Sequence, residues 1–216
     1  MGSQDRRMSE ARAGARMRDE KALITHHEAG HAIAALMTAV GDLDGGVSVC
    51  ILAGRGNGNA QIGDWVTGEP VQAAFVFYAG PWAEARVQWQ QPSLEGLDDT
   101  DGNGESFRDR VRAAFLEGVG VTSDLASYNE MARIDSSIPK REPYWARELE
   151  RAWPVIKELA NALRGGLDSA EPEPGPGTEL PANRDRKMKR FKMADTDVVA
   201  LVQPLLEARG IWRTVT

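Results

Sequence analysis

The three histidines of this chain lie within six positions, in the stretch THHEAGHAIAAL, residues 25–36. His27 and His31 form an H-E-x-x-H pattern, with Glu28 directly after the first histidine. Residues four apart lie on the same face of a helix, so the two imidazoles can hold one metal ion. Glu28 would then take a proton from a zinc-activated water, which is the general-base role in zinc peptidases. The pattern therefore predicts a zinc site, with a structural role for His26, which is turned by about 100° from His27.

A catalytic zinc site normally has three protein ligands, so a third ligand must come from elsewhere in the chain. The metzincin extension of the motif is excluded, because it would need a glycine at Ala34 and a histidine at Met37. The single cysteine, Cys50, excludes a zinc cluster built from cysteines. Spacing alone leaves six downstream carboxylates open as the third ligand: Glu69, Glu84, Asp98, Asp99, Asp101 and Asp124.

Composition limits the kind of protein that can carry this site. At 216 residues and 42% hydrophobic, the chain can bury one sizeable core. The net charge of -6 argues against a surface that binds nucleic acid, so no nucleic-acid partner is expected. No apolar stretch approaches the roughly 20 residues that span a bilayer, so no membrane insertion is expected. The lone cysteine and the charged N-terminal segment, which does not resemble a secretory signal, indicate a cytoplasmic protein.

Hydrophobic periodicity predicts a mainly α (α+β) fold with a small β-sheet beside the H-E-x-x-H helix. Helices are expected at residues 19–40, 71–90, 107–134 with a break near 118–120, and 144–163. Strands are expected at residues 47–52 and 60–66, on either side of a turn in AGRGNGN. The Pro-rich and Gly-rich stretch that follows residue 168 is typical of a linker, and a short docking helix is expected after it.

Five segments resemble the FtsH-type ATP-dependent zinc proteases, in that family's order. ITHHEAGHAIAAL is similar to the active-site helix YHEAGHA, and VSVCILAGRGNGNAQIG is similar to the strand, Gly-Arg turn and strand after it. VFYAGPWAEARV resembles LAGRAAEEL, and GVTSDLASYNEMAR resembles GASNDLxxATxLAR. ELERAWPVIKELANALRGGLD is similar to the closing helix of the family. The resemblance implies that Asp124 is the third zinc ligand beside His27 and His31, with Glu28 as the base. Glu84 is the next candidate ligand, although a salt-bridged or surface role fits it better.

This resemblance divides the chain into four parts. Residues 1–20 form a flexible or helical leader, and residues 21–168 form the helical, FtsH-like zinc peptidase domain. A Pro/Gly-rich and basic linker is expected at residues 169–193, and a C-terminal short helix at residues 194–216. The chain has no G-x-x-x-x-G-K-[ST] loop, so we expect it to bind no ATP.

The function predicted from these features is a zinc-dependent metalloendopeptidase that hydrolyses flexible or unfolded polypeptides without an ATPase of its own. We expect substrate to pair as an extended strand with an exposed sheet edge in NAQIGDWV, at Gln61, Ile62, Gly63 and Asp64. The alternative is a non-catalytic, peptidase-like interaction module that retains zinc for structure. The intact Glu28 favours the enzyme. The oligomeric state is not predicted.

Two further stretches are weaker candidates for binding. DDTDGNGESFRDR resembles an EF-hand loop, but Arg110 stands where calcium needs a bidentate glutamate, so an acidic surface loop is the better interpretation. The basic run RDRKMKRFK, residues 184–192, has the charge to contact nucleic acid or acidic lipid. Its place in the predicted linker favours a solvated tail.

Overall fold

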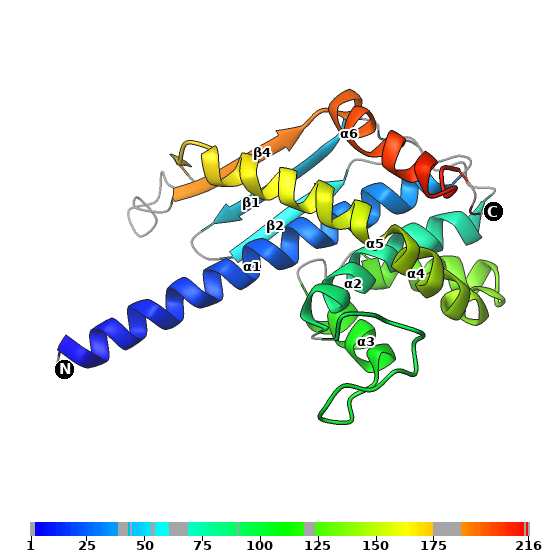
Figure 1. Cartoon of the computed structure of the whole chain (residues 1–216), viewed down its shortest axis with the longest axis horizontal. Coiled ribbons are helices and arrows are strands. Elements are labelled where there is room, and N and C mark those ends of the chain that lie inside the picture. Colours follow the sequence, from blue (N-terminus) through cyan, green and yellow to red (C-terminus); the bar gives the residue numbers. More distant parts are fainter. Residues whose placement is uncertain are drawn as a thin grey trace.

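The computed structural model describes residues 3–38, 43, 45–52, 55–60, 69–89, 91–118, 124–174, 187–213 and 215, without the side chains of residues 3–19, 52 and 55–60. This part of the chain is mainly helical with a small antiparallel sheet, as predicted (Figure 1). Its elements are, in order, α1 (Ser3–Met37), β1 (Val47–Leu52), β2 (Arg55–Ala60), α2 (Pro70–Gln88), α3 (Phe107–Glu117), α4 (Asp124–Ile134), α5 (Ile138–Ser169), β3 (Glu173–Pro174), β4 (Lys187–Met193) and α6 (Asp195–Ala208).

The long helix α1 carries the H-E-x-x-H pattern and contacts α2, α5, β1 and β2. Its apolar stripe, which includes Ile33, Leu36 and Met37, is fully buried. Gly30 allows α2 to come close, because a Cβ atom there would lie 2.8 Å from the Cβ of Ala83. The helix is longer than the 19–40 segment predicted, since it begins at Ser3 and ends at Met37.

The sheet has the strand order β2-β1-β4-β3, and all of its pairs are antiparallel. β1 matches the prediction, and the alternate residues Val47, Val49 and Ile51 are buried. The prediction of a turn in AGRGNGN was wrong, because β2 occupies Arg55–Ala60. Residues 61–66 of the second predicted strand lie outside the described residues. The backbone of this Gly-rich and Asn-rich segment pairs with β1 along its whole length, which composition did not reveal.

The basic run was also predicted incorrectly, because residues 187–193 form β4 and not a linker. β4 pairs with β1 over six residue pairs, and Met188 is buried while its neighbours alternate toward solvent. The pairing with β1 therefore places this basic segment inside the sheet, although its composition is rich in Lys and Arg. The helix expected after it is α6.

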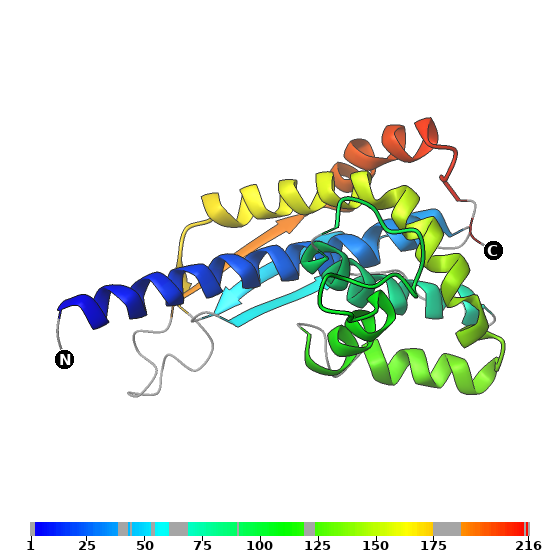
Figure 2. The same cartoon turned by 60° about the horizontal axis from the view of Figure 1, so that its bottom comes forward.

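Two layers of helices hold the site. Figure 2 shows α5 beside α1 on the side of β4, while α2, α3 and α4 lie together near the C-terminal end of α1. α2 is buried on most of its circumference, because it contacts α1, α3, α4 and α5. Aromatic rings fill the space between these helices, and Trp82 makes edge contacts with both Phe107 and Trp153.

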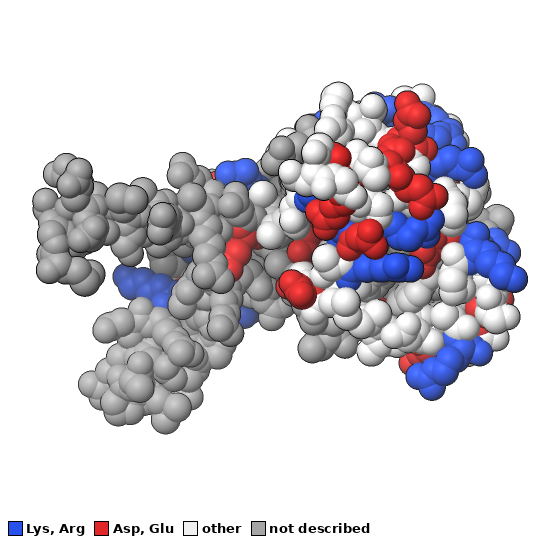
Figure 3. All heavy atoms as spheres, turned by 90° about the horizontal axis from the view of Figure 1, so that it is seen from below, with Lys and Arg blue, Asp and Glu red and all other residues white. Residues whose placement is uncertain are grey.

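The described surface mixes charges of both signs. On the face seen from below, acidic and basic side chains lie next to one another (Figure 3). The described surface also contains ion pairs, such as Arg108 with Asp98 and Arg112 with Asp109. The described part of this face therefore carries no continuous basic area of the kind that follows a phosphate backbone. None of the helices in the described ranges has both the length and the apolar character needed to cross a membrane.

Candidate metal centre

Three potential ligand atoms converge between α1 and the first turn of α4. The Nε2 atom of His27 lies 2.9 Å from Oδ2 of Asp124 and 3.1 Å from Nε2 of His31. The Nε2 atom of His31 lies 3.3 Å from the same oxygen of Asp124. All three residues are buried. The helical spacing brings the two imidazoles together, and the packing of α4 against α2 brings the carboxylate to them.

The other nitrogen of each imidazole already has an acceptor. Nδ1 of His31 lies 2.7 Å from the carbonyl oxygen of Val76, and Nδ1 of His27 lies 3.3 Å from Oε2 of Glu84. A carbonyl oxygen can only accept, so His31 carries its proton on Nδ1 and presents a lone pair at Nε2. When His27 is neutral and donates to Glu84, its Nε2 also presents a lone pair. Two nitrogen lone pairs and one carboxylate oxygen then face one another, an arrangement that a cation stabilises.

The spacing of these atoms fits a tetrahedral metal ion. Zinc binds imidazole nitrogen and carboxylate oxygen at about 2.0–2.2 Å, so two ligands on a tetrahedron lie about 3.3–3.6 Å apart. The observed separations of 2.9, 3.1 and 3.3 Å need only a slight expansion to reach that range. Histidine ligands that donate their second N–H to a carboxylate or a carbonyl are also typical of zinc sites. The donor set therefore fits zinc.

The electrostatics of the site favour positive charge. Burial opposes the imidazolium form of His27, but hydrogen bonds to Asp124 and Glu84 and the charge of Glu28 outweigh it and raise the pKa of His27 to about 10. Burial likewise opposes the charge of Asp124, but the two histidines lower the pKa of its carboxyl well below the usual value. A proton or a metal ion can supply this charge, and they compete for the Nε2 atom of His27.

Glu28 lies beside the converging atoms and not among them. It is 4% exposed, and its charge acts on His27. The H-E-x-x-H spacing explains this position, since Glu28 follows His27 directly and is turned by about 100° from it around the helix. A buried carboxylate beside the candidate ligands has the chemistry of a proton acceptor.

The structure places the remaining predicted site residues as follows. Glu84 contacts Nδ1 of His27, the nitrogen that faces away from Asp124, so it lies outside the converging set. Glu69 precedes α2 and is exposed, and Asp98 pairs with Arg108. His26 donates to the carbonyl of Ala22 and stacks on Trp153, which fits a structural role. The proposed substrate residues Gln61, Ile62, Gly63 and Asp64 lie outside the described residues.

Sequence reasoning missed the two groups that orient the imidazoles. Nothing in the sequence marks the carbonyl of Val76 as a partner of His31, because every residue has such a group. Glu84 gave a signal as an acid in a mostly apolar helix, but its role depends on which imidazole nitrogen it reaches. Gly118 closes the other side of this carboxylate, because a Cβ atom there would lie 2.5 Å from Oε2 of Glu84.

The EF-hand-like loop is closed by an arginine. Nη2 of Arg110 lies 2.5 Å from Oδ2 of Asp101 and 2.9 Å from Oε2 of Glu105. The other oxygen of Asp101 accepts the backbone N–H groups of Asn103 and Glu105. The guanidinium therefore binds the carboxylates that a calcium ion would need.

Comparisons with known proteins do not assign this chain to a family. No protein-family model, no curated protein and no solved structure matches it. The candidate site consequently stands on its own geometry, which is that of two histidines and one aspartate around a place for a cation.

Proposed function

We propose that the chain is a zinc-dependent metalloendopeptidase, with His27, His31 and Asp124 as the metal ligands and Glu28 as the general base. The observation that carries this proposal is the convergence of the two Nε2 atoms and the Asp124 oxygen within 2.9–3.3 Å, while both Nδ1 atoms have acceptors. A cation at this centre would replace the Nε2 proton of His27 and would be bound by all three atoms.

Each residue has a distinct task in the proposed reaction. Zinc bound at this site would supply the Lewis acidity that makes water a nucleophile near neutral pH. Glu28 takes the proton of that water and passes it to the leaving amine of the peptide. Glu84 and the Val76 carbonyl hold the imidazoles of His27 and His31 in the orientation that exposes their Nε2 lone pairs.

The strand order of the sheet favours a substrate that binds in an extended conformation. β2 lies at one edge of the order β2-β1-β4-β3, and it contacts α1, which carries the candidate ligands. A peptide that adds to a sheet edge is held by main-chain hydrogen bonds, which tolerate many sequences and require an unfolded segment. We therefore propose that flexible polypeptides are the substrates, with residues 61–64, which follow β2, as part of the binding strand.

The experiment combines metal content with cleavage. Zinc per chain is measured by elemental mass spectrometry for the full chain and for Asp124→Ala, Glu28→Gln and the control Glu130→Gln, an exposed carboxylate on α4. We expect about one zinc per chain in all except Asp124→Ala. Cleavage of unstructured peptides should fall by about 10²–10⁴-fold in Glu28→Gln and stay unchanged in Glu130→Gln.

Two outcomes would contradict the proposal in different ways. Zinc without any peptide cleavage by the wild-type chain would favour the non-catalytic module that holds zinc for structure. Absence of zinc and of any zinc-dependent change in stability would remove the metal site itself.

A further inference from the structure

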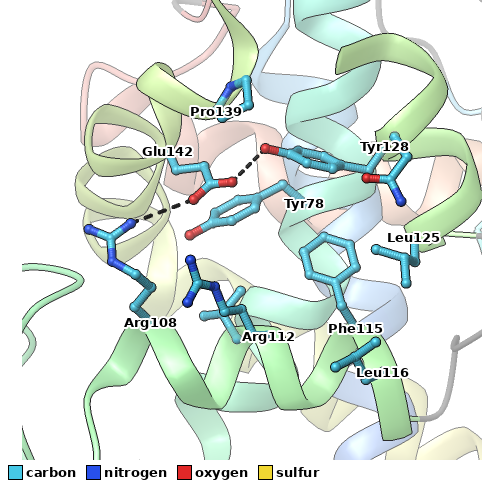
Figure 4. A pocket seen from close by; sticks show the side chains of 11 residues that line it. Tyr78, Arg108, Arg112, Phe115, Leu116, Leu125, Tyr128, Pro139 and Glu142 are labelled. Atoms are coloured by element: carbon cyan, nitrogen blue, oxygen red, sulfur yellow. Dashed lines mark hydrogen bonds and ion pairs between the residues drawn. The ribbon is translucent and has the colours of Figure 1, made fainter. Parts of the chain in front are cut away.

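A second candidate site lies away from the metal centre, in a pocket of about 400 Å³ between α2, α3, α4 and the start of α5 (Figure 4). This volume falls in the range of small-molecule sites. None of the candidate metal ligands lines it. Its polar lining includes Tyr78, Arg108, Arg112, Tyr128 and Glu142.

The pocket contains a buried hydrogen-bond donor without an acceptor. Tyr78 is 1% exposed, and its hydroxyl group has no hydrogen-bond partner among the described residues. Burial and the nearby charge of Glu142 raise the pKa of Tyr78 well above its usual value, so the hydroxyl keeps its proton. An unsatisfied buried donor destabilises the folded chain, and a ligand that supplies an acceptor removes this cost.

The hydroxyl group of Tyr128, in the same pocket, has the hydrogen-bond acceptor that Tyr78 lacks. Its hydroxyl donates to Oε1 of Glu142 at 2.5 Å, and Oε2 of Glu142 lies 3.7 Å from Nη1 of Arg108. The one carboxylate among the lining residues is therefore already bound by Tyr128 and Arg108. The Tyr78 hydroxyl points toward the side of the pocket that holds the guanidinium groups of Arg108 and Arg112 (Figure 4).

The charges around this end leave room for an anion. Arg108 also binds Asp98 outside the pocket, and Arg112 lies 3.7 Å from Asp109 while its side chain is 70% exposed. Two guanidinium groups therefore line the pocket with a single carboxylate. Among the described residues, the ion pair that Arg112 would give up is long and solvent-screened.

The opposite end of the pocket is apolar. Phe115, Leu116 and Leu125 lie together on that side (Figure 4). Leu116 is 62% exposed, so apolar surface is available at the rim. A ligand that lies across the pocket would thus meet donors at one end and hydrocarbon at the other.

We propose that this pocket binds a carboxylate carried on a compact apolar group. The carboxylate accepts hydrogen bonds from the Tyr78 hydroxyl and Arg112, and the apolar group packs against Phe115, Leu116 and Leu125. Two sources share this chemistry: a free aromatic or aliphatic acid, and the C-terminal residue of a peptide. The proposal does not depend on the metal site.

The test measures binding by calorimetry and by NMR titration of the full chain, with 3-phenylpropionate as the probe. Its amide, 3-phenylpropanamide, has the same apolar group without the charge. We expect the acid to bind and the amide to bind about tenfold more weakly, because charge-assisted hydrogen bonds are lost. A peptide that ends in a free phenylalanine, compared with its C-terminal amide, distinguishes the two sources: tighter binding than the free acid assigns the peptide terminus.

Three variants assign the binding to this pocket. Tyr78→Phe removes only an unpartnered hydroxyl and keeps the ring contacts, so the chain should fold and lose affinity by about tenfold. Arg112→Gln should lose a similar factor, whereas Arg147→Gln, an exposed arginine of α5 outside the pocket, should bind like the wild type. Equal binding of acid and amide, no effect of both pocket variants, or no binding up to about 10 mM would each overturn the proposal.

Discussion

Gly80 lies directly against His31. A Cβ atom built on Gly80 would overlap the Nε2 and Cε1 atoms of His31 and would lie 2.9 Å from Nε2 of His27. Helix α2 therefore contacts the two candidate ligand nitrogens with its bare backbone at this position. Any side chain would have to occupy the space in which the nitrogens meet, so glycine is required by proximity and not by its backbone angles.

Replacement of Gly80 by alanine should abolish metal binding. The added methyl group cannot move, because α2 is buried between α1, α3, α4 and α5, so the imidazoles must turn away from Asp124. We expect zinc per chain to fall from about one to near zero in elemental mass spectrometry.

The matched control for this prediction is Gly165→Ala. Gly165 lies in α5, and a Cβ atom there would meet no other atom within 4 Å. This variant should retain zinc and gain up to about 1 kcal/mol of stability, since alanine favours helix over glycine. Zinc bound by Gly80→Ala at the wild-type level would show that the nitrogens do not bind metal where they converge.

Sequence spacing predicted two of the three residues of this site. H-E-x-x-H spacing predicted that His27 and His31 share a face, because residues four apart must do so on any helix. It left the third ligand open, since Asp124 is 93 residues from His31 and only the packing of α4 on α2 brings it there. The resemblance to a protease family selected Asp124, and the structure brings that residue to the two imidazoles.

Replacement of Glu84 by glutamine should weaken zinc binding without removing it. The amide is nearly the same size, but it loses the negative charge that holds the Nδ1 proton of His27. Loss of such a partner typically costs about 10–100-fold in metal affinity. Competition with a chromophoric chelator measures this factor. Glu158→Gln, an exposed carboxylate of α5, is the control, and equal affinities of the two variants would exclude this role for Glu84.

Zinc binding should release at least one proton near pH 7.5. The pKa of His27 is raised to about 10 in the metal-free site, so its imidazole is protonated at this pH and must lose the Nε2 proton to bind a metal. An unperturbed histidine would release only about a tenth of a proton there. Calorimetry in buffers of different ionisation enthalpy measures the number.

The sign of this linkage sets the pH profile. The apparent zinc affinity should rise by about tenfold per pH unit between about pH 7 and pH 9, and the rise should weaken near pH 10 as His27 loses its proton without metal. A proton release near zero at pH 7.5 would mean that His27 is already neutral in the metal-free site.

The elements that sequence patterns missed are those defined by their neighbours. β1 was predictable because Val47, Val49 and Ile51 alternate with more polar residues. β2 has a composition typical of turns, and it is a strand because β1 pairs with it. β4 carries so many basic residues that composition indicated a tail, although its backbone fills the position between β1 and β3. Pairing across the sheet decided both strands, and pairing is not a local property.

Calcium should leave the stability of the wild-type chain unchanged, because Arg110 already binds Asp101 and Glu105. The guanidinium also lies over the ring of Trp89, 5.5 Å from its centroid, which holds it in the loop.

Arg110→Ala should therefore lower the Tm by roughly 2–4 °C, as the two carboxylates lose their shared partner. Arg112→Ala is the control on the same helix, because its only ion pair in the described residues is long and exposed. Thermal unfolding with and without calcium measures both effects, and a rise in the wild-type Tm on adding calcium would show that the ion displaces the arginine.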